Sequence, residues 1–135
     1  MAARSEVSKK NKYWIDRHRH YELKHFCLQY PNWKKFYEDA IYISATSTDV
    51  PAKTNEPSDP TSKQGIRRTY YSKRIELVEK VAREADENLH CYILKAVTED
   101  LSYTYLKAVM DVPCGRDMYY DRYRRFFWLL DKARD

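Results

Sequence analysis

Glycine is scarce in this chain, with two residues among 135, and runs of β-branched residues are few. A β-rich fold needs many tight turns, which glycine favours, so this composition predicts an all-α protein. No apolar run approaches the ~18 residues of a membrane-spanning helix, and no segment resembles a signal peptide. We therefore expect a cytoplasmic protein that has no membrane partner.

Cysteine is also rare, and its pattern matches no metal site. The three cysteines are widely spaced and odd in number, which predicts buried thiols in a reducing compartment. Three histidines lie near the first cysteine, but one of them projects away from the face that the other two share. A glycine-rich phosphate loop and a nucleophile elbow are both missing. We therefore predict no metal site, no cofactor and no enzyme activity. The candidate metal ligands considered are Cys27, Cys91, Cys114, His18, His20 and His25.

Positive charge is in excess, and it is unevenly distributed. The net charge is +5. Residues 1–35 carry nine Lys or Arg against three Asp or Glu, and residues 114–135 carry six against four. Residues 36–113 carry ten against thirteen. A nucleic-acid-binding protein uses such a separation to neutralise phosphates, whereas a uniformly solvated chain does not need it. The pattern therefore favours a nucleic-acid partner.

A segment rich in proline and small polar residues divides the chain. Residues 44–60 contain three prolines among Ser, Thr, Asn and Asp, and they have almost nothing to bury. This composition predicts a long linker. The linker separates residues 1–43, a basic tail followed by a helical hairpin, from residues 61–135, a helical domain.

The expected hairpin contains one helix over residues 12–30 and another over residues 33–42. The first eleven residues are polar and basic, which is typical of a frayed tail. Pro31 suits the start of the second helix. The apolar stripe expected on the second helix consists of Trp33, Phe36, Tyr37 and Ile41.

Two further helices are predicted after the linker. Asp59 followed by Pro60 is typical of an N-cap and a first helical position, so we expect a helix over residues 60–85. A helix over residues 89–97 is expected to support the motif that follows it. The apolar positions of the two helices are Ile66, Tyr70, Ile75, Leu77, Val78, Val81, Tyr92, Ile93 and Val97.

The last third of the chain has the pattern of a helix-turn-helix. Apolar residues at helical spacing predict a helix over residues 101–110. Pro113 and Gly115 then interrupt the pattern, because proline lacks an amide hydrogen and glycine tolerates positive φ. A second helix is expected from Arg116 to Leu130. Two helices joined by three to five residues have the geometry of this motif.

The second helix of this motif has two different faces. At about 100° per residue, Tyr119, Tyr123, Phe126 and Leu130 share a narrow apolar arc that is expected to pack on a core. The opposite face suits either solvent, as in any amphipathic helix, or the major groove of DNA. We predict that the DNA-binding residues are Arg116, Asp117, Tyr120, Asp121, Arg122, Arg124 and Arg125. Of these, Arg116, Tyr120 and Arg124 are expected to reach bases, and Arg122 and Arg125 to contact phosphates.

Residues 100–126 resemble region four of the sigma-70-type transcription factors. The matching pattern is Asp100-Leu101-Ser102-Tyr103, an amphipathic helix, an apolar turn residue at Val112, and then Gly115 and a recognition helix. The resemblance implies that Leu106 and Val109 are buried. Asp111 departs from the pattern because the family has glycine there, and a left-handed backbone accommodates aspartate at some cost.

Over most of its length the chain is also similar to small late-gene regulators of phages of Gram-positive bacteria, the ArpU and RinA types. Residues 27–35 (CLQYPNWKK) and 119–130 (YYDRYRRFFWLL) are among the similar stretches. The resemblance implies a transcriptional regulator that binds double-stranded DNA, with host RNA polymerase and a second copy of the chain as further candidate partners.

Two alternative functions remain open at this point. One is a DNA-packaging recognition subunit of the small-terminase type, since such proteins also use a small helix-turn-helix and assemble into rings. The other is a protein-interaction module whose hairpin binds host polymerase or another regulator. If the first interpretation holds, we expect a fragment over residues 59–135 to retain DNA binding by itself.

Overall fold

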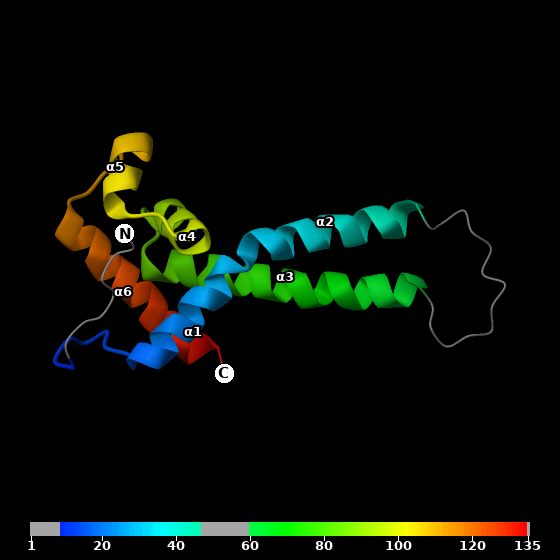
Figure 1. Ribbon diagram of the computed structural model, residues 1–135, viewed down its shortest axis with the longest axis horizontal. Coiled ribbons are helices and arrows are strands. Elements are labelled where there is room, and N and C mark those ends of the chain that lie inside the picture. The colour runs from blue at the N-terminus through cyan, green and yellow to red at the C-terminus, as the bar shows by residue number, and fades with distance from the viewer. Residues whose placement is uncertain (1–8, 47–59, 135) are drawn as a thin grey trace. The chain divides into compact units, whose positions relative to one another are not determined.

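The computed structural model describes residues 9–46 and 60–134, and this part of the chain is all-helical, as predicted. Six helices are present within it (Figure 1). Their bounds are α1 (Arg17–Leu28), α2 (Tyr30–Thr46), α3 (Pro60–Ala85), α4 (His90–Glu99), α5 (Tyr103–Met110) and α6 (Arg116–Ala133).

Most helix boundaries lie close to the predicted ones, and the exceptions have local causes. Helix α1 begins at Arg17 rather than at residue 12, because the Asp16 carboxylate accepts a hydrogen bond from the His18 amide at 3.0 Å and caps the helix there. Helix α2 begins at Tyr30, so that Pro31 lies in its first turn, where the missing amide hydrogen costs little. Most of the predicted linker, residues 47–59, lies outside the described residues.

The chain forms two compact units, and their division differs from the predicted one. The first unit contains the chain up to Gln29 and again from Leu77 onward, and the second unit is Tyr30–Glu76. The two helices predicted for the N-terminal region are present as α1 and α2, but each belongs to a different unit. Helix α1 therefore belongs with α4, α5 and α6. Helix α3 belongs to the second unit up to Glu76 and to the first unit from Leu77 onward.

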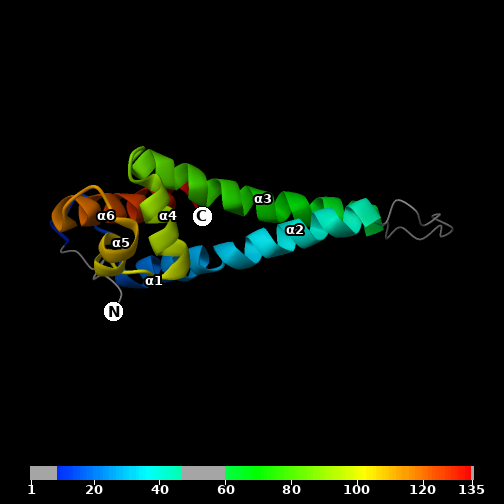
Figure 2. The ribbon, with the colours of Figure 1, turned by 90° about the horizontal axis from the view of Figure 1, so that it is seen from above.

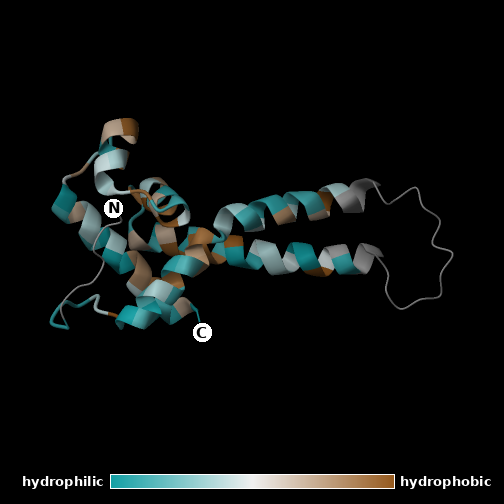
Figure 3. Cartoon of the chain, in the orientation of Figure 1, coloured by the Kyte–Doolittle hydropathy of each residue, from teal (hydrophilic) through white to brown (hydrophobic). Residues whose placement is uncertain are grey.

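The first unit has a continuous apolar core. Helix α1 packs on both α4 and α6, and α4 also packs on α5 and α6. Figure 2 shows α4 between α1 and the end of α3, and Figure 3 shows hydrophobic residues gathered where these helices meet. The core residues come from all five helices of the unit, and they include Leu23, Phe26, Cys27, Val78, Val81, Ala82, Ile93, Val97, Leu106, Tyr119, Phe126, Phe127 and Leu130.

The second unit is a pair of antiparallel helical segments with few shared contacts. Helix α2 and the first half of α3 lie side by side in both views (Figures 1 and 2), and the rings of Phe36 and Tyr71 are 5.4 Å apart. Several apolar residues expected to pack are instead exposed, which corrects the prediction for Phe36, Ile41, Ile66 and Tyr70. The reason is geometric, since two helices alone share only one face.

The three cysteines are free thiols, but they do not share one environment. Cys27 is fully buried in α1, and this burial raises the pKa of its thiol. Cys91 is exposed and Cys114 is half-buried, so the prediction of buried thiols is correct for one of the three.

Candidate nucleic-acid interface

The turn between α5 and α6 is held by three local interactions. Asp111 ends α5 in the left-handed conformation, with φ of 53°, as its place in the pattern predicted. The Tyr103 hydroxyl donates a hydrogen bond to the Cys114 carbonyl at 2.7 Å, and Lys107 Nζ donates to the Val112 carbonyl at 2.9 Å. Val112 itself is fully buried. These contacts fix the direction in which α6 leaves the turn.

Two expectations for this motif need correction. Gly115 has φ of −77°, so it is the N-cap of α6 in an extended conformation and does not use positive φ. Val109 was expected to be buried beside Leu106, yet its side chain is 62% exposed. Helix α5 has only eight residues, and it turns a single narrow face, which includes Tyr103 and Leu106, toward the core.

Helix α6 is oriented as its periodicity predicts. Tyr119, Tyr123, Phe126 and Leu130 are all buried, together with Phe127. The core on which α6 packs includes both α4 and α1. Because the apolar arc is buried, the predicted DNA-binding residues lie on the sides and on the back of the helix.

The first turn of α6 presents an anchored arginine. Arg116 is exposed, its Nη2 donates a hydrogen bond to Thr104 Oγ1 at 3.2 Å, and its guanidinium lies 5.4 Å from the Tyr103 ring centre. Asp117 is exposed beside it. Tyr120 was expected to project from the outer face, but it is half-buried, with its ring 5.1 Å from that of Tyr119.

Arg122 is already paired within the protein. Its Nε lies 3.1 Å from Asp86 Oδ2, and its Nη1 lies 3.6 Å from Asp121. Asp86 also accepts hydrogen bonds from the amides of Asn88 and Leu89, so it organises the connection between α3 and α4. An arginine in such a pair would have to exchange one anion for another to contact a phosphate. The geometry therefore gives Arg122 a role in holding α6.

The second half of α6 is covered on one side by the segment that precedes α1. Tyr13 is buried, and its ring makes an edge contact with Trp128 at 5.6 Å. Arg125 Nη1 donates a hydrogen bond to the Tyr13 hydroxyl at 3.4 Å, and this bond lowers the pKa of the phenol below its usual value. Tyr13 was predicted to lie in a helix, and its contacts with α6 join residues that are far apart in the chain.

Two lysines lie on this side of α6, one from the segment that precedes α1 and one from α6 itself. Lys12 Nζ lies 4.9 Å from the Tyr13 ring centre, and Lys132 Nζ lies 3.7 Å from that of Trp128. Arg124 is half-buried. Cations of two distant parts of the chain thus gather beside Arg125, although Asp117 and Asp121 keep the surface mixed in charge.

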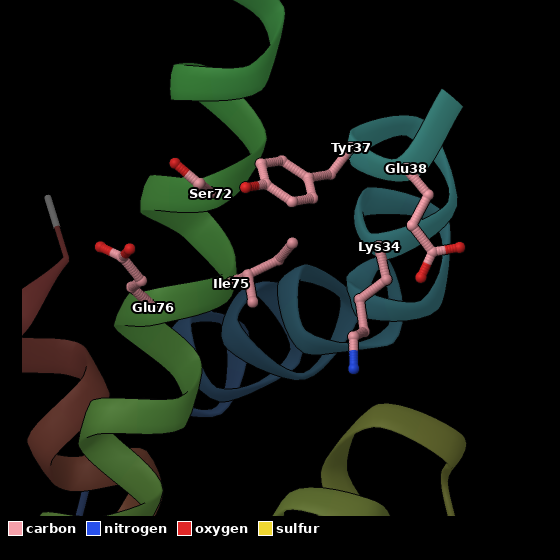
Figure 4. Close-up of a pocket in the computed structure, with 6 residues that line it drawn as sticks. All are labelled: Lys34, Tyr37, Glu38, Ser72, Ile75 and Glu76. Atoms are coloured by element: carbon pink, nitrogen blue, oxygen red, sulfur yellow. The ribbon is translucent and has the colours of Figure 1, made fainter. Parts of the chain in front are cut away.

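Neither the histidines nor the pocket between α2 and α3 offers an alternative site among the described residues. His20 packs on Phe127 with ring centres 4.7 Å apart, and no three His, Cys, Asp or Glu side chains in the described ranges could share a metal ion. A pocket of about 260 Å³ lies within the second unit (Figure 4). Tyr37 and Ile75 extend between its two helices, while its charged residues, Lys34, Glu38 and Glu76, point in different directions. Convergent polar groups, which a small-molecule site needs, are therefore missing from this pocket.

Over residues 9–46 and 60–134, no helix is both long enough and apolar enough to cross a membrane. Comparisons with protein-family models, with curated proteins and with solved structures gave no match.

Proposed function

We propose that this protein binds double-stranded DNA and that α6 enters the major groove. The observation that carries the proposal is the combination of a fixed turn with an α6 helix whose apolar arc is buried. The N-terminal half of this helix, outside the buried arc, carries Arg116, which is exposed, and Tyr120 and Arg124, which are half-buried. A recognition helix reads base edges with its N-terminal half.

Each of the predicted charged residues has a distinct place in this proposal. Arg116 and Arg124 are the candidates for bidentate contacts to guanine, and Asp117 or Asp121 could accept a hydrogen bond from cytosine. Arg125 is the candidate for a phosphate contact, supported by the neighbouring lysines of residues 9–12. Because Arg122 pairs with Asp86, we assign it to positioning α6 on the rest of the unit.

The resemblance to late-gene regulators gives the proposal its biological setting. A phage transcriptional regulator would act in the cytoplasm of the bacterial host, with RNA polymerase or a second copy of the chain as an additional partner. The packaging-subunit alternative requires DNA binding as well, so the DNA that is preferred distinguishes the two. The interaction-module alternative requires no DNA binding.

The test is an affinity measurement on full-length protein with three duplexes of equal length. One contains a phage late promoter, one a phage packaging site, and one a scrambled sequence. We expect tighter binding to the promoter duplex and a log affinity that falls linearly with log salt. Preference for the packaging site would favour the packaging role. Absence of salt-dependent binding to all three duplexes would contradict the proposal.

A further inference from the structure

The first half of α3 is rich in cations and free of carboxylates. Residues 60–75 contain five Lys or Arg and no Asp or Glu, and the first acidic residue is Glu76. Elsewhere in the helix, cations pair with acids in the usual way, as Lys80 does with Glu84 at 3.9 Å. The first half of α3 therefore has a charge that its own helix does not neutralise.

Four of these five cations fall on one side of the helix together with Ile66 and Tyr70, and Arg68 lies outside this group. Spacings of three and four residues place one group of side chains along a single stripe, with Tyr71 and Ile75 on the side that faces α2. All members of the stripe are exposed except Arg74, which is half-buried. We call this set the α3 stripe, and it consists of Lys63, Ile66, Arg67, Tyr70, Lys73 and Arg74.

One cation of the α3 stripe has a fixed orientation. The Arg74 guanidinium carbon lies 3.6 Å from the centre of the Tyr70 ring, and Arg74 Nη1 donates a hydrogen bond to the Tyr70 carbonyl at 3.4 Å. A guanidinium stacked in this way has lost part of its conformational freedom before any ligand arrives, and its remaining N–H groups can form a bidentate contact with phosphate.

The stripe borders a shallow hollow of about 480 Å³, with Gly65, Ile66 and Thr69 among its lining residues. Gly65 lies in the second turn of α3, and glycine inside a helix costs about 0.5–1 kcal/mol relative to alanine. A side-chain methyl at Gly65 would meet only the end of the Arg68 side chain, at 4.0 Å. Glycine at this position is therefore not required by packing, and its absence of a side chain allows a ligand to approach the helix closely.

The spacing of the charges indicates the class of ligand. From residue 63 to residue 74 the helix advances about 16 Å, at 1.5 Å per residue, and it carries a cation on each turn or nearly so. Duplex DNA has one negative charge per ~1.7 Å of its axis, so it supplies several phosphates over that length. An acidic peptide would pair with the same cations, because arginine binds carboxylate as well as phosphate, and it is the alternative that the test must exclude.

We propose that the α3 stripe binds the phosphate backbone of double-stranded DNA independently of sequence, as a second surface in addition to α6. Sequence-independent backbone contacts would raise the affinity for all duplexes and would leave the choice among sequences to α6.

The test replaces the four cations of the stripe in the full-length chain by glutamine, as Lys63→Gln, Arg67→Gln, Lys73→Gln and Arg74→Gln. A matched control removes the same charge from exposed positions elsewhere, as Lys34→Gln, Lys35→Gln, Lys80→Gln and Arg83→Gln. Circular dichroism checks that both proteins keep the helix content of the parent. The probes are a scrambled-sequence DNA duplex and polyglutamate of comparable charge.

We expect the stripe variant to bind the scrambled duplex roughly tenfold more weakly or worse at moderate salt, and its salt slope to be smaller by about three to four, since each lost phosphate contact removes ~0.9. The control should keep most of the parent's slope. Equal losses in the two variants would reduce the effect to net charge and overturn the proposal. The proposal would also be overturned if the parent bound polyglutamate at least as tightly as DNA and the stripe variant lost that binding. That result would favour an acidic protein partner.

The experiment distinguishes a failure of the α3 stripe proposal from a failure of the α6 proposal. If α6 does not read sequence, the parent binds promoter and scrambled duplexes equally, but the stripe variant still loses affinity for both. If the α3 stripe does not bind DNA, the parent keeps its sequence preference and the stripe variant binds as the control does.

Discussion

Apolar residues at similar helical spacing are buried in the first compact unit and exposed in the second. In the first unit, Ile93, Tyr119 and Phe126 are buried almost completely. In the second unit, Ile66 is 68% exposed and Tyr70 is 48% exposed, although both recur at the same helical spacing. The difference follows from the number of neighbours, because a helix surrounded by several others buries most of its apolar residues, and a helix with one partner buries a single stripe. Helical periodicity therefore predicts a helix in both units but predicts burial only in the first.

Removing α1 should produce the largest effect, because it takes buried side chains out of the core of the first unit. A fragment over residues 59–135 lacks Leu23, Phe26 and Cys27, which are all buried in the core. Burial of each large apolar side chain stabilises a fold by ~1.5–3 kcal/mol, against a total of ~5–15 kcal/mol. We now expect this fragment not to unfold cooperatively on heating, as followed by circular dichroism, and hence not to retain DNA binding by itself.

A peptide over residues 9–29, added to the fragment, is the control, and it should restore a cooperative transition. A fragment that melts at the temperature of the full chain would contradict the placement of α1 in this core.

A pair of phenylalanine substitutions measures the difference between the units directly. Phe126→Ala removes a fully buried ring and should lower the free energy of unfolding by about 3–5 kcal/mol. Phe36→Ala removes a ring that is nearly half exposed, so its cost should be on the order of 1 kcal/mol. Urea unfolding of both variants gives the two values. Equal costs would mean that the second unit is as well packed as the first.

Alkaline pH should destabilise the first unit through its buried tyrosines. Burial raises the pKa of Tyr119 and of Tyr123 far above the usual value near 10. Below pH ~10 the tyrosines are protonated in both states, so stability does not depend on them. Above it the unfolded chain releases protons that the folded chain keeps, and each tyrosine costs ~1.4 kcal/mol per pH unit.

The free energy of unfolding, measured in urea between pH 8 and pH 11, should therefore decline, with an earlier contribution from the buried Cys27 thiol. Tyr123→Phe should make the decline shallower, because it removes one of the two buried phenols. An unchanged slope in Tyr123→Phe would show that this residue ionises in the folded protein.

A smaller effect on stability should distinguish the neighbouring residues Tyr119 and Tyr103. The Tyr119 hydroxyl is buried and has no hydrogen-bond partner among the described residues, whereas the Tyr103 hydroxyl donates to Cys114. Tyr119→Phe should stabilise the protein by about 1 kcal/mol, because it removes an unsatisfied polar group. Tyr103→Phe should destabilise it by about 1 kcal/mol. Thermal melting of the two variants gives both signs, and a loss of stability in Tyr119→Phe would reveal a partner for its hydroxyl.

The sequence predicts local structure well because local structure has local causes. Pro60 begins α3, Ser102 caps α5 through a hydrogen bond from the Tyr105 amide, and Asp111 ends α5, all within one turn of the residues concerned. The orientation of α6 was also predictable, because five aromatic or aliphatic residues fix it.

Tertiary partners were not predictable by the same reasoning. Nothing local indicates that α1 completes the core, that Tyr13 lies against Trp128, or that Arg122 pairs with Asp86, since these residues are far apart in the chain. The structure therefore corrects the predicted site more than it corrects the predicted fold. Of the arginines predicted to bind DNA, Arg116, Arg122 and Arg125 are each in contact with another part of the protein.

The central claim is that α6 reads DNA sequence, and the comparison of two neighbouring arginines tests it most directly. In full-length protein, affinity is measured for Arg124→Ala, Arg125→Ala and the control Arg83→Ala, each with the preferred duplex and with single-base variants of it. The account predicts that Arg124→Ala relaxes the preference at one base pair and costs ~1–3 kcal/mol there. Arg125→Ala should weaken binding to every duplex and lower the salt slope by about one, and Arg83→Ala should do neither. Unchanged affinity and unchanged preference in both α6 variants would remove this helix from the interface and contradict the account.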